Sequence, residues 1–382
     1  MIKPIIAPAT FAGFCICFFF ASCKGQVPAE ATEARPQSDN LYRFPFDPKI
    51  ASDTSEQISE YVVSVFEDSH RNLWFGTMSD GAVRYGTAEG QPGNTSLTYF
   101  STKEGICDNT VASIAEDHQG NIWFGTHNGA SRFDGKTVTN FGLAEGLHGA
   151  GCKILVDRKG TIWAGTNHGV FKYSKSNQLT KKEGFSAFNL PIPPIENLSY
   201  KWEAGKVWHI MEDRKGDLWF ARDGYGACKY DGKSFNHFTQ RDGLCSNNVS
   251  NIVEDAQGNL WFACLNSYYP KKGTDGGLCC YDGKIIRQYK AIEGLSKNDI
   301  YTVFADKKGD IWIGATHFGA YRYSKGKFTL YKKTNRMDLT NSFGLQSMLE
   351  DSKGRLWFGF SGGLFRFDAN AIVNVTKLGP WR

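Results

Sequence analysis

The sequence of 382 residues has little excess charge, no long apolar segment beyond its first residues and no recognisable catalytic arrangement. Its net charge of +5 is too small and too evenly spread to indicate a nucleic-acid-binding protein. The apolar run Ile5–Phe20 is broken by Pro8 and Gly13, and it is shorter than the ~20 residues that a membrane-spanning helix needs. The cysteines show no metal-ligand spacing with histidine, and neither a Ser-His-Asp order nor a paired carboxylate is visible. These absences disfavour a nucleic-acid-binding protein, an anchor helix and a familiar enzyme.

The first residues have the pattern of a processing segment. The apolar run ends in Phe-Ala-Ser-Cys, which resembles a bacterial lipobox, although Phe20 stands where Leu is usual. We therefore predict that residues 1–22 are a lipoprotein signal peptide and that acyl chains on Cys23 anchor the mature protein to a membrane. An ordinary secretory signal is the alternative. Because Lys24 is not acidic, the outer membrane is favoured over the inner one, and residues 23–40 have the composition of a flexible tether.

A motif of the form E-D-x-x-G-x-L-W-F-G-T recurs along the chain, and each copy places a tryptophan at the same position. These residues are Trp74, Trp123, Trp163, Trp219, Trp261, Trp312 and Trp357. They follow one another at intervals of roughly 40 to 56 residues, and such a period, with short apolar runs broken by Gly and Asp, is typical of β-propeller blades. The sequence therefore predicts an all-β fold, a seven-bladed β-propeller of four-stranded antiparallel blades, as a single domain over residues 41–382.

The aspartate and the tryptophan of each copy have structural explanations. In the clearest copy, Asp306 and Gly309 flank a turn in which the carboxylate caps backbone N–H groups and the glycine takes a positive φ. A calcium loop would need several converging carboxylates, which this pattern lacks. A tryptophan buries ~150–250 Å², on the order of 4–6 kcal/mol as an upper bound, as expected of a residue that holds neighbouring blades together.

Two segments could close the ring. The last blade offers residues 372–376 as its own fourth strand. The aromatic-rich run Leu41–Phe46 could instead pair at the seam, although Pro45 restricts it to an edge. Either arrangement would remove exposed sheet edges.

The cysteines after Cys23 occupy repeat positions that are apolar or small in other copies. Cys107 and Cys245 fall at the same position in different blades, which argues against a bond between them. We expect buried free thiols, with Cys264 paired to Cys279 or Cys280 as the one plausible local disulfide.

The blocks V-x-x-I-x-E-D-x-x-G-N-L-W-F-G-T-x-x-G-x-x-R-Y-D-G and G-L-x-x-N-x-V resemble the two-component regulator propeller repeat, over about residues 55–377. That repeat builds the periplasmic sensor region of many bacterial hybrid histidine kinases. Such kinases carry two propellers, a further β domain, a membrane helix and kinase modules, whereas here we expect one ring without a kinase or DNA-binding tail. The resemblance therefore implies an extracytoplasmic propeller that binds a ligand or partner, and signalling does not carry over directly.

Polar residues mark two places near the predicted central channel. Asn109, Asn247, Asn248 and Asn298 lie where one blade crosses to the next, either to cap the crossing turn or to contact a ligand. A second set lies on the inner strands, and solvation of a wet channel suffices to explain its polarity. It comprises Ser64, Ser113, Lys153, His209, Asn251, Thr302 and Ser347.

We predict a ligand-binding site on the face that carries these crossings and the loops between second and third strands. The longest such loop, Asn266–Asp275, resembles a binding loop or lid. Trp208 and Tyr301 are aromatic platforms beside hydrogen-bonding neighbours, which suits sugars or peptides. The candidate contacts lie where blades three to six meet: Trp208, His209, Arg222, Asp223, Tyr225, Tyr268, Tyr269, Tyr301 and His317.

Three functions remain open at this point. The first is a non-catalytic, lipid-anchored protein of the cell envelope that captures a small molecule, glycan, peptide or envelope protein, without a cofactor or nucleic acid. The second is an enzyme resembling streptogramin lyases, which use rim histidines and a metal. Here His127, His168 and His317 lie in different blades without a glutamate beside them. The third is a scaffold within an envelope complex.

Overall fold

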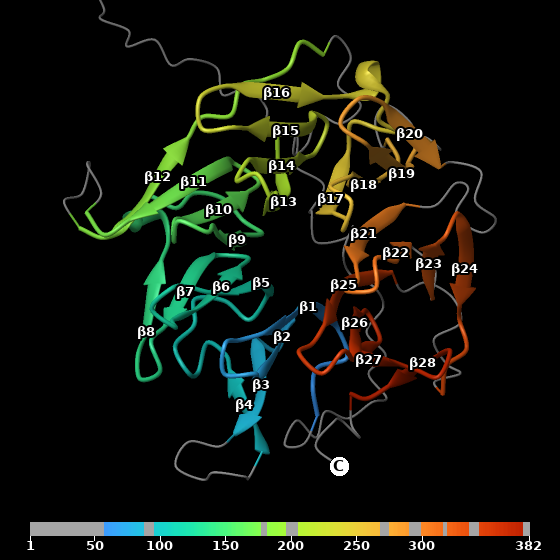
Figure 1. Cartoon of the computed structure of the whole chain (residues 1–382). Coiled ribbons are helices and arrows are strands. Elements are labelled where there is room, and N and C mark those ends of the chain that lie inside the picture. Colours follow the sequence, from blue (N-terminus) through green and yellow to red (C-terminus); the bar gives the residue numbers. More distant parts are fainter. Residues whose placement is uncertain are drawn as a thin grey trace, which may run out of the picture. The chain divides into compact units, whose positions relative to one another are not determined.

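The computed structural model describes residues 57–87, 95–176, 182–195, 205–267, 275–289, 299–315, 319–335 and 344–376. The chain divides into two compact units, Met1–Ala51 and Ser52–Arg382, and the described residues all belong to the second. That unit is a seven-bladed β-propeller in which each blade is a four-stranded antiparallel sheet (Figure 1). The predicted fold class is therefore confirmed. Within the described ranges, no helix is long and apolar enough to cross a membrane.

Each blade follows the chain from its inner to its outer strand, and the first strands of neighbouring blades contact one another around the ring. Blades one and two comprise β1 (Val62–Glu67), β2 (Leu73–Thr77), β3 (Ala82–Thr87), β4 (Thr95–Phe100), β5 (Val111–Glu116), β6 (Ile122–Thr126), β7 (Gly129–Phe133) and β8 (Val138–Phe141). Blades three and four comprise β9 (Lys153–Val156), β10 (Ile162–Thr166), β11 (Gly169–Ser174), β12 (Gly184–Phe188), β13 (Val207–Glu212), β14 (Leu218–Arg222), β15 (Gly226–Tyr230) and β16 (Phe235–Phe238).

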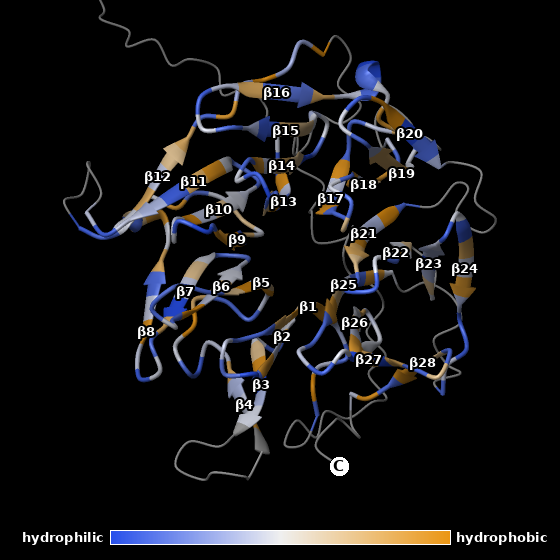
Figure 2. Cartoon of the chain, viewed as in Figure 1, coloured by the Kyte–Doolittle hydropathy of each residue, from blue (hydrophilic) through white to orange (hydrophobic). Residues whose placement is uncertain are grey.

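The remaining three blades have the same plan. They comprise β17 (Val249–Glu254), β18 (Leu260–Cys264), β19 (Gly277–Tyr281), β20 (Ile286–Tyr289), β21 (Ile300–Ala305), β22 (Ile311–Ala315), β23 (Ala320–Ser324), β24 (Lys327–Tyr331), β25 (Leu345–Glu350), β26 (Leu356–Phe360), β27 (Gly363–Asp368) and β28 (Ala371–Asn374). Two short 3-10 helices, Leu143–Glu145 and Gln240–Asp242, lie in crossings between blades. Hydrophobic colour is concentrated in the strands and hydrophilic colour in the turns (Figure 2).

Each repeated tryptophan donates its indole N–H to the aspartate six residues before it, at 2.8–2.9 Å. The same carboxylates accept backbone N–H groups of their turns; Asp306, for example, accepts from Lys308 and Asp310. Gly309 takes a φ of 87°, a region that favours glycine. The predicted turn role of the aspartate is confirmed, and the structure adds that the aspartate also satisfies a buried tryptophan.

The tryptophans hold neighbouring blades together, as predicted, and none is more than 5 % exposed. Trp219 of blade four packs in a cluster with Val249 and Ile252 of blade five. Trp357 of the last blade packs in the same way against Val62 and Phe75 of the first blade. The repeated Trp is thus a core residue shared by two sheets.

The last blade supplies its own outer strand, so the first of the two closure alternatives is observed. β28 pairs with β27, and the backbone N–H of Ile58 donates to the carbonyl of Thr376 at 3.1 Å. The outer edge of β28 is itself covered, because Ile372 donates to the carbonyl of Lys333 at 2.8 Å. The alternative segment, residues 41–46, lies outside the described residues.

The cysteines of the described ranges are free thiols, and all except Cys107 are buried. Cys107 and Cys245 do occupy equivalent positions, since their backbone N–H groups donate at 3.0 Å to Ser131 Oγ and Cys279 Sγ. Ser131 pairs with Phe124 of β6, and Cys279 pairs with the equivalent Phe262 of β18. The thiols therefore fill apolar positions of the repeat.

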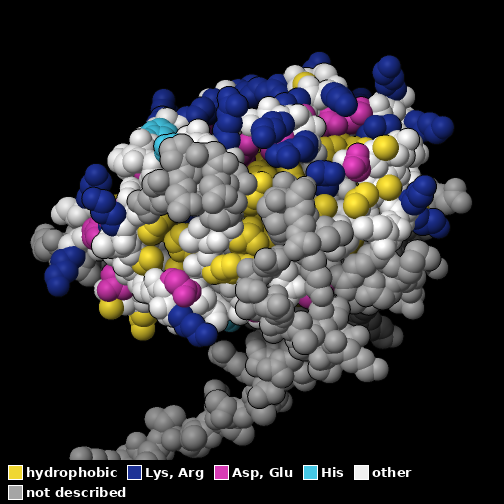
Figure 3. Space-filling model, turned by 90° about the horizontal axis from the view of Figure 1, so that it is seen from below, with side chains coloured by type: hydrophobic (Ala, Val, Ile, Leu, Met, Phe, Trp, Pro, Cys, Tyr) yellow, Lys and Arg dark blue, Asp and Glu magenta, His cyan; other side chains and the backbone are white. Residues whose placement is uncertain are grey.

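Positive charge is concentrated at the tips of the turns that follow the inner strands. There the repeated aspartates are buried, whereas the next side chains are exposed. Exposed cations of these turns include Arg158, Lys159, Arg214, Lys215, Lys307 and Lys308. Lys and Arg side chains gather along the upper edge of Figure 3.

Candidate ligand-binding site

Trp208 lies near the start of the inner strand β13, where the pairing with β14 shifts by one residue. Its side chain is half-buried and packs partly against the cluster that contains Leu244 and Val249. The ammonium group of Lys206 lies 4.0 Å from the centre of its ring. Its indole N–H is buried and has no hydrogen-bond partner among the described residues. Trp208 thus combines a ring that a cation covers with a buried donor that no described residue satisfies.

Lys153, Lys206 and His209 form a basic group at the inner strands of blades three and four. Lys153 donates from Nζ to the carbonyl of Ala112 at 2.8 Å. Burial and then the charge of Lys206 lower the pKa of Lys153 to about 8, although the Cys152 thiol acts in the opposite direction. Burial and then the charge of Lys153 lower the pKa of His209 to about 4. Burial is the larger cause of both low pKa values, and the charges that add to it are positive.

His209 is neutral near pH 7, and its hydrogen bonding indicates the tautomer. Its Nδ1 accepts the backbone N–H of Ile252 in blade five at 3.4 Å. An accepting Nδ1 leaves the proton of the neutral ring on Nε2. His209 therefore offers an Nε2–H donor.

The polar set on the inner strands has a second explanation besides channel solvation. Ser113 Oγ accepts the N–H of Ile154 at 2.9 Å and donates to the carbonyl of Cys152 at 3.1 Å. Asn251 Oδ1 accepts the N–H of Val303 at 3.4 Å. Together with His209, these side chains link inner strands of successive blades, so much of their polarity is structural.

Tyr301 lies on β21, with β17 between its strand and that of Trp208. Burial and then the neighbouring charge of Asp299 raise the pKa of Tyr301 to about 12. Tyr301 in turn acts on Tyr61 of the first blade, whose pKa is raised chiefly by burial. Its hydroxyl is therefore protonated and available for hydrogen bonding.

Arg222, Asp223 and Tyr225 are much less open than residues of a binding rim. They are 4 %, 4 % and 9 % exposed. Arg222 donates from Nη1 to the carbonyl of Pro191 at 2.8 Å, and its guanidinium lies 4.6 Å from the ring centre of Tyr225. Backbone bonds join Asp223 to the segment that contains Gly205. The structure thus places these three residues beneath crossing segments, and their contact with a ligand remains a prediction.

The other predicted site residues cannot be placed. Tyr268, Tyr269, His317 and Cys23 lie outside the described residues. Of the rim histidines, His127 and His168 are exposed after β6 and β10. In the part of the chain that the structure describes, no group of His, Cys, Asp and Glu side chains is arranged to hold a metal ion.

The crossing asparagines cap turns, which was the structural alternative. Asn109 Oδ1 accepts the N–H of Thr102 at 2.8 Å, and Asn247 Oδ1 accepts that of Gln240 at the same distance. Asn248 bridges blades by accepting from Gly224. Asn298 lies outside the described residues.

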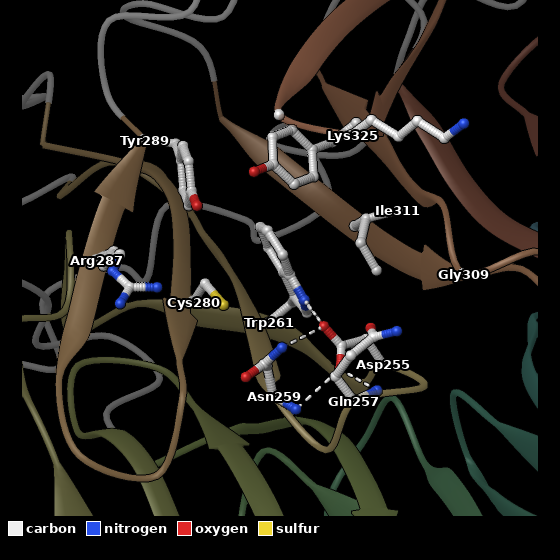
Figure 4. A pocket seen from close by; sticks show the side chains of 12 residues that line it. Asp255, Gln257, Asn259, Trp261, Cys280, Arg287, Tyr289, Gly309, Ile311 and Lys325 are labelled. Carbon is white, nitrogen blue, oxygen red and sulfur yellow. Dashed lines mark hydrogen bonds between the residues drawn. The ribbon is translucent and has the colours of Figure 1, made fainter.

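A pocket of about 350 Å³ lies between blades five and six, among residues that sequence reasoning did not select. Its lining includes Trp261, Cys280, Tyr289 and Tyr323 (Figure 4). Lys153 and Lys206 were also missed as site residues. The sequence did contain a signal for the basic group, because Lys153 is the only Lys or Arg of the inner polar set. It also contained a signal for the pocket, because Cys280 takes a position that is basic in the other blades.

The fold and its repeats define a β-propeller that presents a polar inner ring and variable loops. Residues 56–79, 105–128, 243–266 and 294–317 match the family described as Two component regulator propeller. The chain therefore carries two-component regulator propeller repeats, as its motifs predicted. No curated protein matches the sequence.

Solved propellers from several bacteria resemble the structure. The extracellular domain of the hybrid two-component system BT3049 from B. thetaiotaomicron is 24 % identical with a TM-score of 0.60, over 81 % of this chain and 39 % of that one. Virginiamycin B lyase from Staphylococcus aureus is 13 % identical with a TM-score of 0.57, over 80 % and 93 %. PorZ, a surface component of the type-IX secretion system of Porphyromonas gingivalis, is 17 % identical with a TM-score of 0.52, over 82 % and 48 %. At these identities the similarity establishes the fold alone.

Proposed function

We propose that this chain is a non-catalytic binding propeller of the cell envelope, held to the outer membrane through Cys23, which captures an acidic saccharide at the inner ends of blades three and four. The observation that carries the proposal is the basic group Lys153, Lys206 and His209 beside the half-buried ring of Trp208. An acidic sugar has a charged group to meet the ammonium groups and a ring that can contact the part of the half-buried indole that Lys206 does not cover.

The electrostatics of the basic group favour an anion. The depressed pKa of Lys153 shows that its surroundings disfavour its own positive charge. A bound carboxylate or sulfate would relieve that unfavourable charge, and the indole N–H of Trp208 and Nε2–H of His209 would add neutral donors. Affinity should therefore fall as ionic strength rises.

Two of the related structures support the location. One is an extracellular domain of a two-component system and another is a bacterial surface component. A signal peptide and a lipid anchor at the start of this chain would place it in the same compartment. A peptide with acidic side chains is the alternative ligand.

The test is an array of acidic glycans, matched neutral glycans and acidic peptides, probed with the protein that begins after Cys23. We expect binding to glycans that bear carboxylate or sulfate groups, and loss of that binding at high salt. Binding confined to neutral glycans would contradict the proposed site, and binding confined to peptides would replace the ligand class.

A further inference from the structure

The residue paired with each repeated tryptophan on the third strand is basic in every blade except blade five. Those basic residues are Arg84, Arg132, Lys172, Lys229, Arg322 and Arg366. In blade five the residue paired with Trp261 is Cys280. One position of an otherwise regular repeat has therefore lost its long cationic side chain.

The basic residue normally covers the face of the tryptophan. In five blades its charged group lies 5.5–5.8 Å from the centre of the tryptophan ring. In the last blade Arg355 takes that place over Trp357, at 5.1 Å. Trp261 is the exception among the repeated tryptophans, since no cation of the described residues lies over it. A cation–π contact on the repeated tryptophan is therefore a regular feature of this propeller. Among the described residues, blade five has no side chain that makes this contact.

The pocket between blades five and six occupies this position. Both Trp261 and Cys280 line it, and its volume is about 350 Å³. The thiol of Cys280 is much shorter than an arginine side chain, so the pocket stays open beside Trp261 (Figure 4). The pocket is thus the place that a cation fills in the other blades.

Arg132 shows which chemical group such a place accepts. Its guanidinium lies 5.7 Å from the ring centre of Trp123 and 5.5 Å from that of Phe141. It also donates to the hydroxyl of Tyr173 in the next blade at 3.0 Å and forms an ion pair with Glu183. Two aromatic rings of one blade and a tyrosine of the next therefore surround the cation.

Blade five keeps the aromatic surroundings, but it has neither the basic side chain nor a counterpart of Glu183, whose position is taken by Gly326. Tyr289 takes the position of Phe141, and its ring stacks on that of Trp261 at 5.5 Å. Tyr323 of blade six takes the position of Tyr173, with its ring 5.3 Å from Trp261 and 5.6 Å from Tyr289. Three aromatic rings thus approach one another around the pocket, an arrangement that suits a positive group.

The charges around the pocket permit a cation to enter. Asp255 is the acidic residue of the lining, and its carboxylate accepts from the indole of Trp261 at 2.9 Å. Arg287 is engaged by Asp282 at 3.0 Å and is 58 % exposed on its side chain. The side chain of Lys325 extends away from Trp261 (Figure 4). The two cations of the lining are therefore at its rim.

We propose that the pocket over Trp261 is a second binding site, which receives a guanidinium or primary ammonium group from a ligand or partner in place of the missing basic side chain. The site is independent of the basic group on blades three and four and takes a ligand of the opposite charge. Its position at the junction of two blades leaves room for more than the charged group alone.

The test follows the indole N–H resonances of the full-length protein with 15N-labelled tryptophan, with Trp261→Phe assigning the relevant signal. N-acetyl-arginine amide should shift the Trp261 signal saturably, in the millimolar range. The neutral isostere N-acetyl-citrulline amide should not. Methylguanidinium and the peptide Gly-Arg-Gly, compared at equal concentration, show whether a free cation is sufficient or a polypeptide is required.

Variants of the pocket give the matched controls. Cys280→Arg restores the residue type of the other blades and should weaken arginine binding by about tenfold or more, because the site is then filled from within. Cys280→Ala should bind like the wild type. Tyr323→Leu removes one wall and should also weaken binding, which keeps the test decisive if Cys280→Arg does not fold. An equal shift with citrulline, no saturable shift with any cation, or unchanged binding by Cys280→Arg would overturn the proposal.

Discussion

Glu67 of the first blade accepts two hydrogen bonds from Ser352 of the last blade, from the backbone N–H at 2.6 Å and from Oγ at 2.8 Å. Equivalent bonds to the turn of the preceding blade are made by Glu116, Glu212, Glu254 and Glu350. Two copies of the motif have Val156 and Ala305 in place of the glutamate. The seam of the ring is therefore bonded like an ordinary junction between blades.

Replacing Glu67 should weaken the seam as much as replacing Glu116 weakens the junction between blades one and two. Glu67→Ala and Glu116→Ala should each lower the free energy of unfolding by about 1 kcal/mol, because both remove charge-assisted hydrogen bonds at partly exposed positions. Urea unfolding measures both values. If Glu116→Ala destabilises the protein and Glu67→Ala does not, other contacts hold the seam.

The fold could be predicted from the sequence because one local rule repeats. Each copy has an aspartate that needs turn N–H donors and a tryptophan that needs an apolar surface and a partner for its indole, and one hairpin satisfies both. Ring closure could not be predicted. Residues 372–376 and Leu41–Phe46 offered similar strand patterns, and the choice depends on packing between the two ends of the ring.

The candidate site was less predictable because it depends on contacts between blades. The loop position of Arg222 suggested exposure, but the residues around Pro191 and Gly205 come from the crossing before blade four and cover it. The proximity of Lys153 and Lys206 likewise joins two blades. An alignment of the repeats could have shown that Cys280 lies opposite Trp261. The functional interpretation of this position depends on the structure, which shows that cations lie over the other repeated tryptophans.

The repeated aspartates should carry much of the stability of the blades. Asp117→Ala leaves the indole of Trp123 and the turn N–H groups without their acceptor, so we expect a loss of about 3 kcal/mol in unfolding free energy. Asp134→Ala is the control, because it removes bonds in an exposed hairpin only. A loss for Asp117→Ala no larger than that of the control would contradict the role assigned to the aspartate.

Acid should destabilise the protein partly through the same group. Burial raises the pKa of Asp117, but bonds from Trp123 and Asn121 outweigh it and hold the pKa below the ordinary 3.8. The stability that Asp117 contributes is fully present above pH 3.8, the ordinary pKa of an aspartate. It is lost as the pH falls through the lower pKa that Asp117 has in the folded state. Unfolding free energy measured from pH 5 to pH 2 should therefore fall less steeply in Asp117→Asn than in the wild type. An identical slope would show that Asp117 does not contribute.

Because of His209, we expect the free energy of unfolding to depend on pH in a second, higher pH range. Its pKa of about 4 in the folded state lies below the ordinary 6.5, so the unfolded chain binds a proton first. Its contribution to stability is present above pH 6.5 and is lost as the pH falls to about 4. Burial is the main cause of the low pKa, and the charge of Lys153 adds to it. His209→Gln should flatten the unfolding free energy between these values, and a profile like that of the wild type would contradict the assignment.

Membrane attachment should depend on one thiol. Cys23→Ser prevents acylation, so the variant should stay unprocessed or leave the membrane fraction. Detergent phase partitioning of whole-cell extracts measures the change, with Cys107→Ser as a control that keeps the anchor. Equal partitioning of Cys23→Ser and the wild type would leave an ordinary secretory signal as the better interpretation.

The measurement that tests the account most directly is the affinity of Lys153→Met for an acidic glycan identified on the array. We expect Lys153→Met to bind at least about tenfold more weakly and with less dependence on salt, because an ion pair in a partly buried site is lost. Trp208→Ala should weaken binding by ~2 kcal/mol or more. Gln346 occupies in blade seven the position that Trp208 occupies in blade four. Gln346→Ala should therefore bind like the wild type. Full affinity and unchanged salt dependence in Lys153→Met would show that the ligand does not bind at the basic group of Lys153, Lys206 and His209.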